Sequence, residues 1–420
     1  MTQVCQYVHD CLRDTVIGFI GTVVIGSIAY LGDDDDGDID VIMLTNKEWP
    51  IGCSSLERLR LLLHGGDQTS TWTAFVVNAR VPILKCTAIV DGRSWSIDIL
   101  HSHSDISHTM DAPTPLETAV CILPTNAAVG LAMTLCVRLR ESRKFNRATL
   151  ILLRQWAKKH HVYGSTVGYP GGSAWAVLLF VYCTVSPGPA QLRGFLVWLC
   201  QWLTDHADLP VTVHNARILH EGGSLADHAD WAGLRHSISR YARVMCILPF
   251  PWDAVEATTA NQLAAADCDM NMTSTVGPLQ HGVLLHELQC SIEAHSDAAM
   301  LTATRHNIPD LLVNIYMCHK ADCCSAWLSH VEARGLLLLT NQLHIHGLCG
   351  RIRPRSVPAE DGESTFTVAV WLGTTSIQCP ALLTLVRNVF HRINHQYTQE
   401  HQCNPTCPLV VGFALGSNSP

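Results

Sequence analysis

Three aspartates lie within apolar segments of this chain, and they constrain its fold more than any other feature. Asp38 and Asp40 lie at the start of the apolar run 39–44, and Asp98 interrupts the run 97–100. Short apolar runs predict buried β-strands, and the period of two in a strand places Asp38 and Asp40 on one face. Like charges on one strand face repel each other, so the pattern indicates that divalent cations separate them.

A third carboxylate from a neighbouring strand would complete a cage of oxygen ligands, which is the environment that Mg²⁺ or Mn²⁺ prefers. We therefore predict Asp38, Asp40 and Asp98 as catalytic residues that bind two ions, as phosphoryl or nucleotidyl transfer requires. Gly26 and Ser27 precede them, and a glycine backbone and a hydroxyl can both approach a phosphate. Taken alone, an Asp-x-Asp pattern also fits a solvated strand end.

Composition limits the class of protein. A chain of 420 residues with 48% hydrophobic content is globular and divides into two or three domains. The net charge of −8 argues against a uniformly basic nucleic-acid binder, so RNA contacts would rely on local patches such as 138–159. The 18 cysteines are spread along a chain without a signal peptide, which favours reduced thiols and an intracellular protein without membrane spans.

The hydrophobic periodicity changes along the chain and predicts an α+β multidomain fold. Residues 1–115 alternate between a helix and several strands, which indicates a mixed sheet that carries the three aspartates. Residues 116–285 are mainly helical, with apolar segments at 149–160, 174–185 and 192–203. Residues 286–420 mix helices and strands again, so we expect a third, α+β domain.

The segment 147–159 carries a basic stripe. Arg147, Arg154 and Lys158 share one helix face, where they could neutralise a triphosphate opposite the metals. A cationic stripe is more often a solvated face, and that interpretation stays open. Tyr163 could stack on a nucleotide or serve as a structural tyrosine.

Several motifs occur in the same order as in the poly(A) polymerases of the nucleotidyltransferase superfamily, which this chain resembles. They are Gly26-Ser27, Asp38-Ile39-Asp40, residues 81–85 (VPILK), 97–100 (IDIL), 152–159 (LLRQWAKK), Val162-Tyr163 and 168–176 (GYPGGSAWA). Trp327, residues 331–332 and 370–373 resemble landmarks of the family's RRM-like RNA-binding domain more loosely.

The resemblance implies a nucleotidyltransferase domain at 1–115, a helical middle domain at 116–285 and an RRM-like domain at 286–420. It implies an enzyme that adds AMP from ATP to RNA 3′ ends in mRNA polyadenylation and releases pyrophosphate. Arg154, Lys158, Tyr163, Gly172 and Ser173 would then contact ATP together with Gly26 and Ser27. The implied partners are RNA and cleavage and polyadenylation factors, and the implied location is the nucleus, otherwise the cytoplasm.

The chain departs from the family pattern at the nucleotide. Arg154 replaces a lysine that reaches the triphosphate, and Ser165 and Ser173 replace an asparagine and a valine. A terminal uridylyltransferase therefore stays open as an alternative. A catalytically silent RNA-binding scaffold is a second alternative, which the intact aspartate triad disfavours.

Two clusters of potential metal ligands lack the paired C-x-x-C spacing of structural zinc sites. They are His101, His103 and His108, and the group Cys318, His319, Cys323 and Cys324. We expect ordinary core and loop residues there.

Overall fold

The computed structural model describes most of the chain and divides it into two compact units. The described residues are 2–31, 38–50, 53–65, 72–77, 82–104, 106, 108–113, 135–137, 139–143, 145–186, 188–205, 211–212, 247–248, 272–273, 275–294, 296, 300–301, 311–317, 331, 338–339, 341–342, 349–358, 364–371, 379–401 and 409–415. The first unit comprises Met1–Leu153 and Gly172–Ser274, and the second comprises Arg154–Gly171 and Thr275–Pro420.

Some residues named in the sequence analysis lie outside the described ones. They are Val81, Trp327, Glu332, Leu372, Gly373, the residues Arg138 and Lys144 of the patch 138–159, and the whole cluster Cys318, His319, Cys323 and Cys324. The expected domain boundary at 115 also lies there, whereas helix α11 runs through the expected boundary at 285. The division into three domains stays a prediction.

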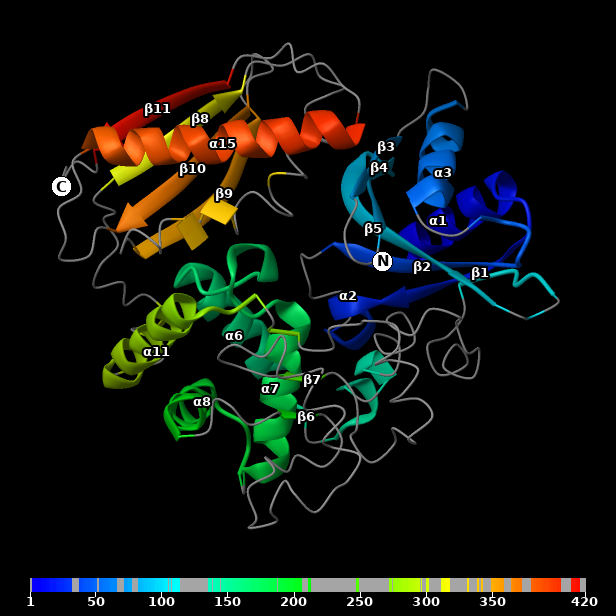
Figure 1. Cartoon of the computed structure of the whole chain (residues 1–420). Helices are drawn as coiled ribbons and strands as arrows, with labels where there is room; N and C mark the ends of the chain where they lie inside the picture. Colours follow the sequence, from blue (N-terminus) through cyan, green and yellow to red (C-terminus); the bar gives the residue numbers. More distant parts are fainter. Residues whose placement is uncertain are drawn as a thin grey trace, which may run out of the picture. The chain divides into compact units, whose positions relative to one another are not determined.

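The first unit begins with a five-stranded mixed sheet (Figure 1). Its elements are α1 (Thr2–Thr15), β1 (Phe19–Ile25), α2 (Gly26–Leu31), β2 (Ile39–Thr45), α3 (Cys53–Gly65), β3 (Trp72–Val77), β4 (Ile83–Val90) and β5 (Arg93–His103). The strand order is β1-β2-β5-β4-β3, in which only the central pair β2 and β5 is parallel. The mixed sheet expected for this region is confirmed.

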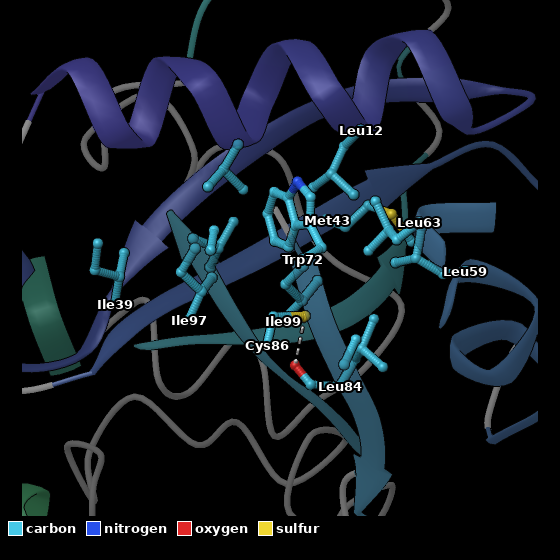
Figure 2. Packing of buried hydrophobic residues seen from close by; sticks show 14 of the residues in the cluster. Leu12, Ile39, Met43, Leu59, Leu63, Trp72, Leu84, Cys86, Ile97 and Ile99 are labelled. Carbon is cyan, nitrogen blue, oxygen red and sulfur yellow. Dashed lines mark hydrogen bonds between the residues drawn. The ribbon is translucent and has the colours of Figure 1, made fainter. Parts of the chain in front are cut away.

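One face of this sheet forms the core. Alternate residues of β2, β4 and β5 pack with the apolar face of α1 and with α3, as Figure 2 shows for Leu12, Met43 and Leu59. Burying an aliphatic side chain of this kind stabilises the fold by about 1.5–3 kcal/mol. Because side chains alternate along a strand, the residues between the core positions face the opposite side, and Asp40 and Asp98 are among them.

The first unit also contains the helices α7 (Gly172–Val185) and α8 (Leu192–Asp205) and the first half of α6 (Arg147–Lys159). Helix α7 is buried along nearly its whole length, which explains why its sequence is apolar on every side. Two short strands, β6 (Val211–Thr212) and β7 (Ile247–Leu248), pair in parallel. None of the described helices combines the length and apolarity needed to cross a bilayer.

The second unit contains a four-stranded antiparallel sheet. Its strands are β8 (Leu311–Met317), β9 (Cys349–Pro358), β10 (Ser364–Trp371) and β11 (Leu409–Leu415), in the order β11-β8-β10-β9. Helix α15 (Cys379–His401) lies between β10 and β11 in the chain, and its apolar stripe is buried at Val386, Val389, Phe390 and Ile393. Counted along the chain, the central strands β8 and β10 are the first and third of the sheet, and the outer strands β11 and β9 are the fourth and second. This order is the RRM-like arrangement. The expected α+β fold class is thus confirmed.

The second unit also includes the last turns of α6 and helix α11 (Pro278–Glu293), which are joined by buried polar contacts. The Trp156 indole Nε1 donates to Ser291 Oγ at 2.9 Å. His160 Nδ1 lies 2.8 Å from Glu287 Oε2, and His160 Nε2 lies 3.0 Å from the carbonyl oxygen of Met300. These contacts fix the end of α6 against α11, because breaking them would leave polar groups unsatisfied in the interior.

Candidate active site

The structure brings the three predicted aspartates to one end of the sheet. Asp40 of β2 and Asp98 of β5 are register partners in the parallel ladder, so their side chains lie on the same sheet face. Asp38 immediately precedes β2 and is the most exposed of the three, with 49% of its side chain accessible. The predicted placement of Asp38 and Asp40 on one face fits this arrangement, although Asp38 lies just outside the strand.

Gly26 adopts a conformation that only glycine takes without strain. Its φ is +72°, and an ideal Cβ built there would overlap the Asp40 carboxylate oxygen Oδ2. The Cys136 thiol donates to the carbonyl oxygen of Gly26 at 3.8 Å, and burial raises the pKa of that thiol to about 12. Gly26 and the half-buried Ser27 therefore begin α2 directly beside Asp40.

Asp98 is largely buried, and burial raises the pKa of its carboxyl group. The neighbouring ammonium of Lys85 opposes this rise in pKa, and the Asp38 carboxylate adds to it. Lys85 Nζ lies 3.1 Å from Asp98 Oδ2 and 3.7 Å from Asp38 Oδ2. The second oxygen of Asp98, Oδ1, is buried and has no hydrogen-bond partner.

These observations test whether the residues fit a divalent cation. A buried carboxylate oxygen without a partner, next to two further carboxylates, is a donor set that suits Mg²⁺ or Mn²⁺. However, no three His, Cys, Asp or Glu side chains in the described part of the chain are arranged closely enough to hold a metal ion. The three aspartates therefore fit the ion by residue type. Because Lys85 contacts the carboxylates of Asp38 and Asp98, these side chains have to move before they can bind the ion.

Lys85 is the last residue of the motif at 81–85, but the sequence alone did not predict its contacts with Asp38 and Asp98. The signal that could have found them is Asp91-Gly92, a dipeptide typical of two-residue hairpins. Both residues have positive φ, 52° and 73°, as a type I′ turn requires. This turn pairs Val90 with Arg93, and the same register places Lys85 opposite Asp98.

The predicted triphosphate contacts on α6 differ in exposure. Arg154 is 8% exposed, whereas Arg147 and Lys158 are exposed to solvent. A buried guanidinium is unusual unless it has a specific role, so Arg154 is not part of a solvated stripe. The Lys158 ammonium lies 5.4 Å from the centre of the Tyr163 ring, a cation–π contact between two predicted nucleotide contacts.

The loop after α6 is held in a fixed shape. Gly164 and Gly168 have φ values of +113° and +85°. The backbone N–H of Gly164 donates to the carbonyl of Pro170, and that of Tyr169 donates to the carbonyl of Gly164, both at 3.0 Å. An ideal Cβ on Gly168 would lie 3.1 Å from the Gln280 side chain, so α11 packs directly on this loop.

The remaining predicted nucleotide contacts belong to the first unit. Gly172 and Ser173 form the first turn of α7, and Ser173 is exposed. The N–H groups of a first helical turn have no partner within the helix, so they can receive an anion. The contact of Arg154, Lys158, Tyr163, Gly172, Ser173, Gly26 and Ser27 with a nucleotide stays a prediction.

His101 and His103 belong to the interior, and His108 is exposed, which fits the expected core and loop residues. His101 Nε2 lies 2.8 Å from Thr45 Oγ1 and Nδ1 lies 3.1 Å from Ser55 Oγ, while His103 Nε2 lies 2.6 Å from the carbonyl of Trp49. Burial, and secondarily the neighbouring His103, lower the pKa of His101 to about 4. These contacts join the ends of β2 and β5 to the start of α3.

Comparison with known proteins identifies one part of the chain. Residues 145–299 match the poly(A) polymerase central domain, so the chain contains a segment of this type over less than half of its length. No curated protein matches the chain.

Solved structures resemble the chain only distantly. The Cid1 poly(U) polymerase is 14% identical with a TM-score of 0.44, over 73% of this chain and 89% of that one. Terminal uridylyl transferase 4 from Trypanosoma brucei is 14% identical with a TM-score of 0.44, over 71% of this chain and 92% of that one. A cytoplasmic RNA terminal U-transferase is 15% identical with a TM-score of 0.42, over 73% and 89%. Similarity at this level does not define a function.

Proposed function

We propose that the protein is a template-independent nucleotidyltransferase that adds AMP from ATP to RNA 3′ ends and releases pyrophosphate. The observation that supports this most directly is the alignment of Asp40 with Asp98 across the parallel strands β2 and β5, with Asp38 two residues from Asp40. The match of residues 145–299 to a poly(A) polymerase central domain supports the same class independently.

Asp38, Asp40 and Asp98 would hold two Mg²⁺ or Mn²⁺ ions. When bound, these ions supply Lewis-acid activation of the RNA 3′-hydroxyl and neutralise the triphosphate. The backbone at Gly26 can approach a phosphate closely because the residue lacks a Cβ, and the Ser27 hydroxyl can donate to a phosphate oxygen. Arg154 and Lys158 would neutralise charge that develops on the leaving pyrophosphate, and no covalent intermediate forms.

Several finer expectations stay predictions from the family resemblance. They are selectivity for ATP, a role in mRNA polyadenylation, cleavage and polyadenylation factors as partners, and nuclear location. Ser165 and Ser173 depart from the poly(A) polymerase pattern near the nucleotide, and this observation favours a uridylyltransferase as the second candidate.

The test is to incubate the purified chain with a short labelled RNA and each of the four NTPs separately, with Mg²⁺ or Mn²⁺, and to size the products. We expect extension that depends on the metal and is strongest with ATP. Strongest extension with UTP would select the second candidate. No extension with any NTP, from a protein that melts cooperatively, would favour a silent RNA-binding scaffold.

A further inference from the structure

Lys85 occupies a position that none of the steps above requires. It lies on β4 directly opposite Asp98 of the antiparallel partner β5. From there its ammonium reaches Asp98 Oδ2 at 3.1 Å and Asp38 Oδ2 at 3.7 Å. One lysine therefore links the carboxylate of Asp98 on β5 with that of Asp38, which immediately precedes β2.

The charges explain why the lysine lies there. Asp38, Asp40 and Asp98 gather at one end of the sheet, and Asp98 is the buried one, so its charge carries a desolvation penalty. An ammonium between two carboxylates offsets their repulsion without any metal ion. Lys85 keeps 33% of its side chain exposed, so its stem can swing toward solvent.

The same position is where a divalent cation shared by Asp38 and Asp98 would have to bind. Such an ion needs carboxylate oxygens at roughly 2.0–2.1 Å, and an ammonium on the same two oxygens both blocks it and repels it. Asp98 Oδ1, which has no hydrogen-bond partner, gives an incoming ion a first point of attachment that the lysine does not occupy.

We propose that Lys85 is a displaceable counter-cation, which holds the aspartates together in the metal-free protein and leaves them when a divalent cation binds. This inference rests on the proposed function for the metal site itself. Lys85 is thus a positioning residue that competes with the ion. Metal binding at this site is an exchange of one cation for another, so the carboxylates stay gathered in both states.

The first experiment measures Mn²⁺ binding to the full chain by titration calorimetry and by the electron paramagnetic resonance of free Mn²⁺. Four proteins are compared: wild type, Lys85→Met, Asp98→Asn and Lys47→Met. Lys47 is an exposed lysine after β2, so its replacement removes the same charge from the same unit. We expect Lys85→Met to bind Mn²⁺ about fivefold more tightly, which is the effect of removing one ion pair. Lys47→Met should bind like wild type.

The outcomes separate the two proposals. Equal or weaker Mn²⁺ binding by Lys85→Met, together with loss of binding in Asp98→Asn, overturns the exchange and leaves the metal site intact. Binding that is unaffected by Asp98→Asn overturns the metal site and the exchange together. If Lys85→Met and Lys47→Met both bound Mn²⁺ more tightly to the same extent, the cause would be the change in net charge. This result would also overturn the exchange.

A second measurement uses the wild-type protein and so does not depend on how a variant folds. The protein is treated briefly with an amine-acylating reagent, with and without saturating Mg²⁺, and acylation at each lysine is quantified by mass spectrometry. We expect acylation of Lys85 to rise at least about threefold with Mg²⁺, because the ammonium loses its ion pairs, while Lys47 stays unchanged. Unchanged or reduced labelling of Lys85 would show that the lysine stays on the aspartates, contrary to the proposal.

Discussion

Replacing Gly26 with alanine should lower both the stability of the fold and the rate of RNA extension. A second glycine of similar conformation allows the two effects to be measured separately. The φ of +72° lies in the left-handed region, which costs an alanine about 1–2 kcal/mol relative to its preferred conformations. The new Cβ would also overlap the Asp40 carboxylate, so Asp40 has to move. A displacement of about 1 Å in a catalytic group can lower the rate about 10²-fold.

Gly92 provides the matched control. Its φ of +73° is nearly the same, but no heavy atom lies within 4 Å of an ideal Cβ at that position. Gly92→Ala therefore carries the backbone cost without the collision. For units of this size each kcal/mol lowers Tm by about 2–4 °C, so the backbone cost alone should lower the Tm of both variants by about 2–8 °C. Only Gly26→Ala should lose about 10²-fold in RNA extension.

The assay combines differential scanning calorimetry with single-nucleotide extension of a labelled RNA under saturating Mg²⁺. The reasoning would be refuted by a Gly26→Ala enzyme that extends RNA as fast as Gly92→Ala at a similar Tm. That result would mean that the Asp40 carboxylate has no fixed position beside Gly26 in the active enzyme.

Four further predictions follow from the site and its surroundings. Asp98→Asn should lower the rate of RNA extension at least about 10³-fold. Its Tm should stay near that of wild type, because the substitution removes a carboxylate whose pKa is raised by burial. An active Asp98→Asn enzyme in the extension assay would exclude a role of Asp98 as metal ligand. Arg154→Ala should raise KM for the NTP and lower kcat, whereas Gln155→Ala at the exposed neighbouring position should change neither in steady-state kinetics. The pKa of His101 is lowered to about 4 in the folded protein, so between about pH 6.5 and 4 the unfolded chain binds one proton more than the folded chain at this residue. As the pH falls through this window, the free energy of unfolding should decrease by up to about 1.4 kcal/mol per pH unit. Urea titrations at several pH values should show a smaller decrease for His101→Asn. Truncation after residue 301, which keeps the Met300 contact to His160, should weaken binding of labelled single-stranded RNA more than binding of ATP, and equal RNA affinity would remove the RNA role of the second unit's sheet.

The elements that sequence predicted best are those whose apolar pattern is strongest. The helices α6, α7 and α8 begin and end within two residues of the expected segments 149–160, 174–185 and 192–203. In each case one face or the whole element is buried, so the pattern of apolar residues reports directly on packing.

The parts that sequence did not predict depend on contacts between distant segments. The periodicity of α6 gives Arg147, Arg154 and Lys158 a common face, yet it cannot tell which of them a neighbouring element covers. The burial of Arg154 is a property of the folded chain and not of the helix alone. The ion pair of Lys85 with Asp98 depends on strand register, which the Asp91-Gly92 turn encodes locally and which the apolar pattern of β4 and β5 alone does not.

The core and the candidate site constrain each other through that register. A slip of one residue between β2 and β5 would move Asp40 or Asp98 onto the face where Met43 and Ile97 pack in Figure 2. An unpaired carboxylate in that core would cost several kcal/mol, so the apolar face selects the pairing that aligns the two aspartates. The alignment in turn concentrates negative charge, which Lys85 offsets in the absence of metal. The sheet can therefore fold with its aspartates already aligned, before any divalent cation binds.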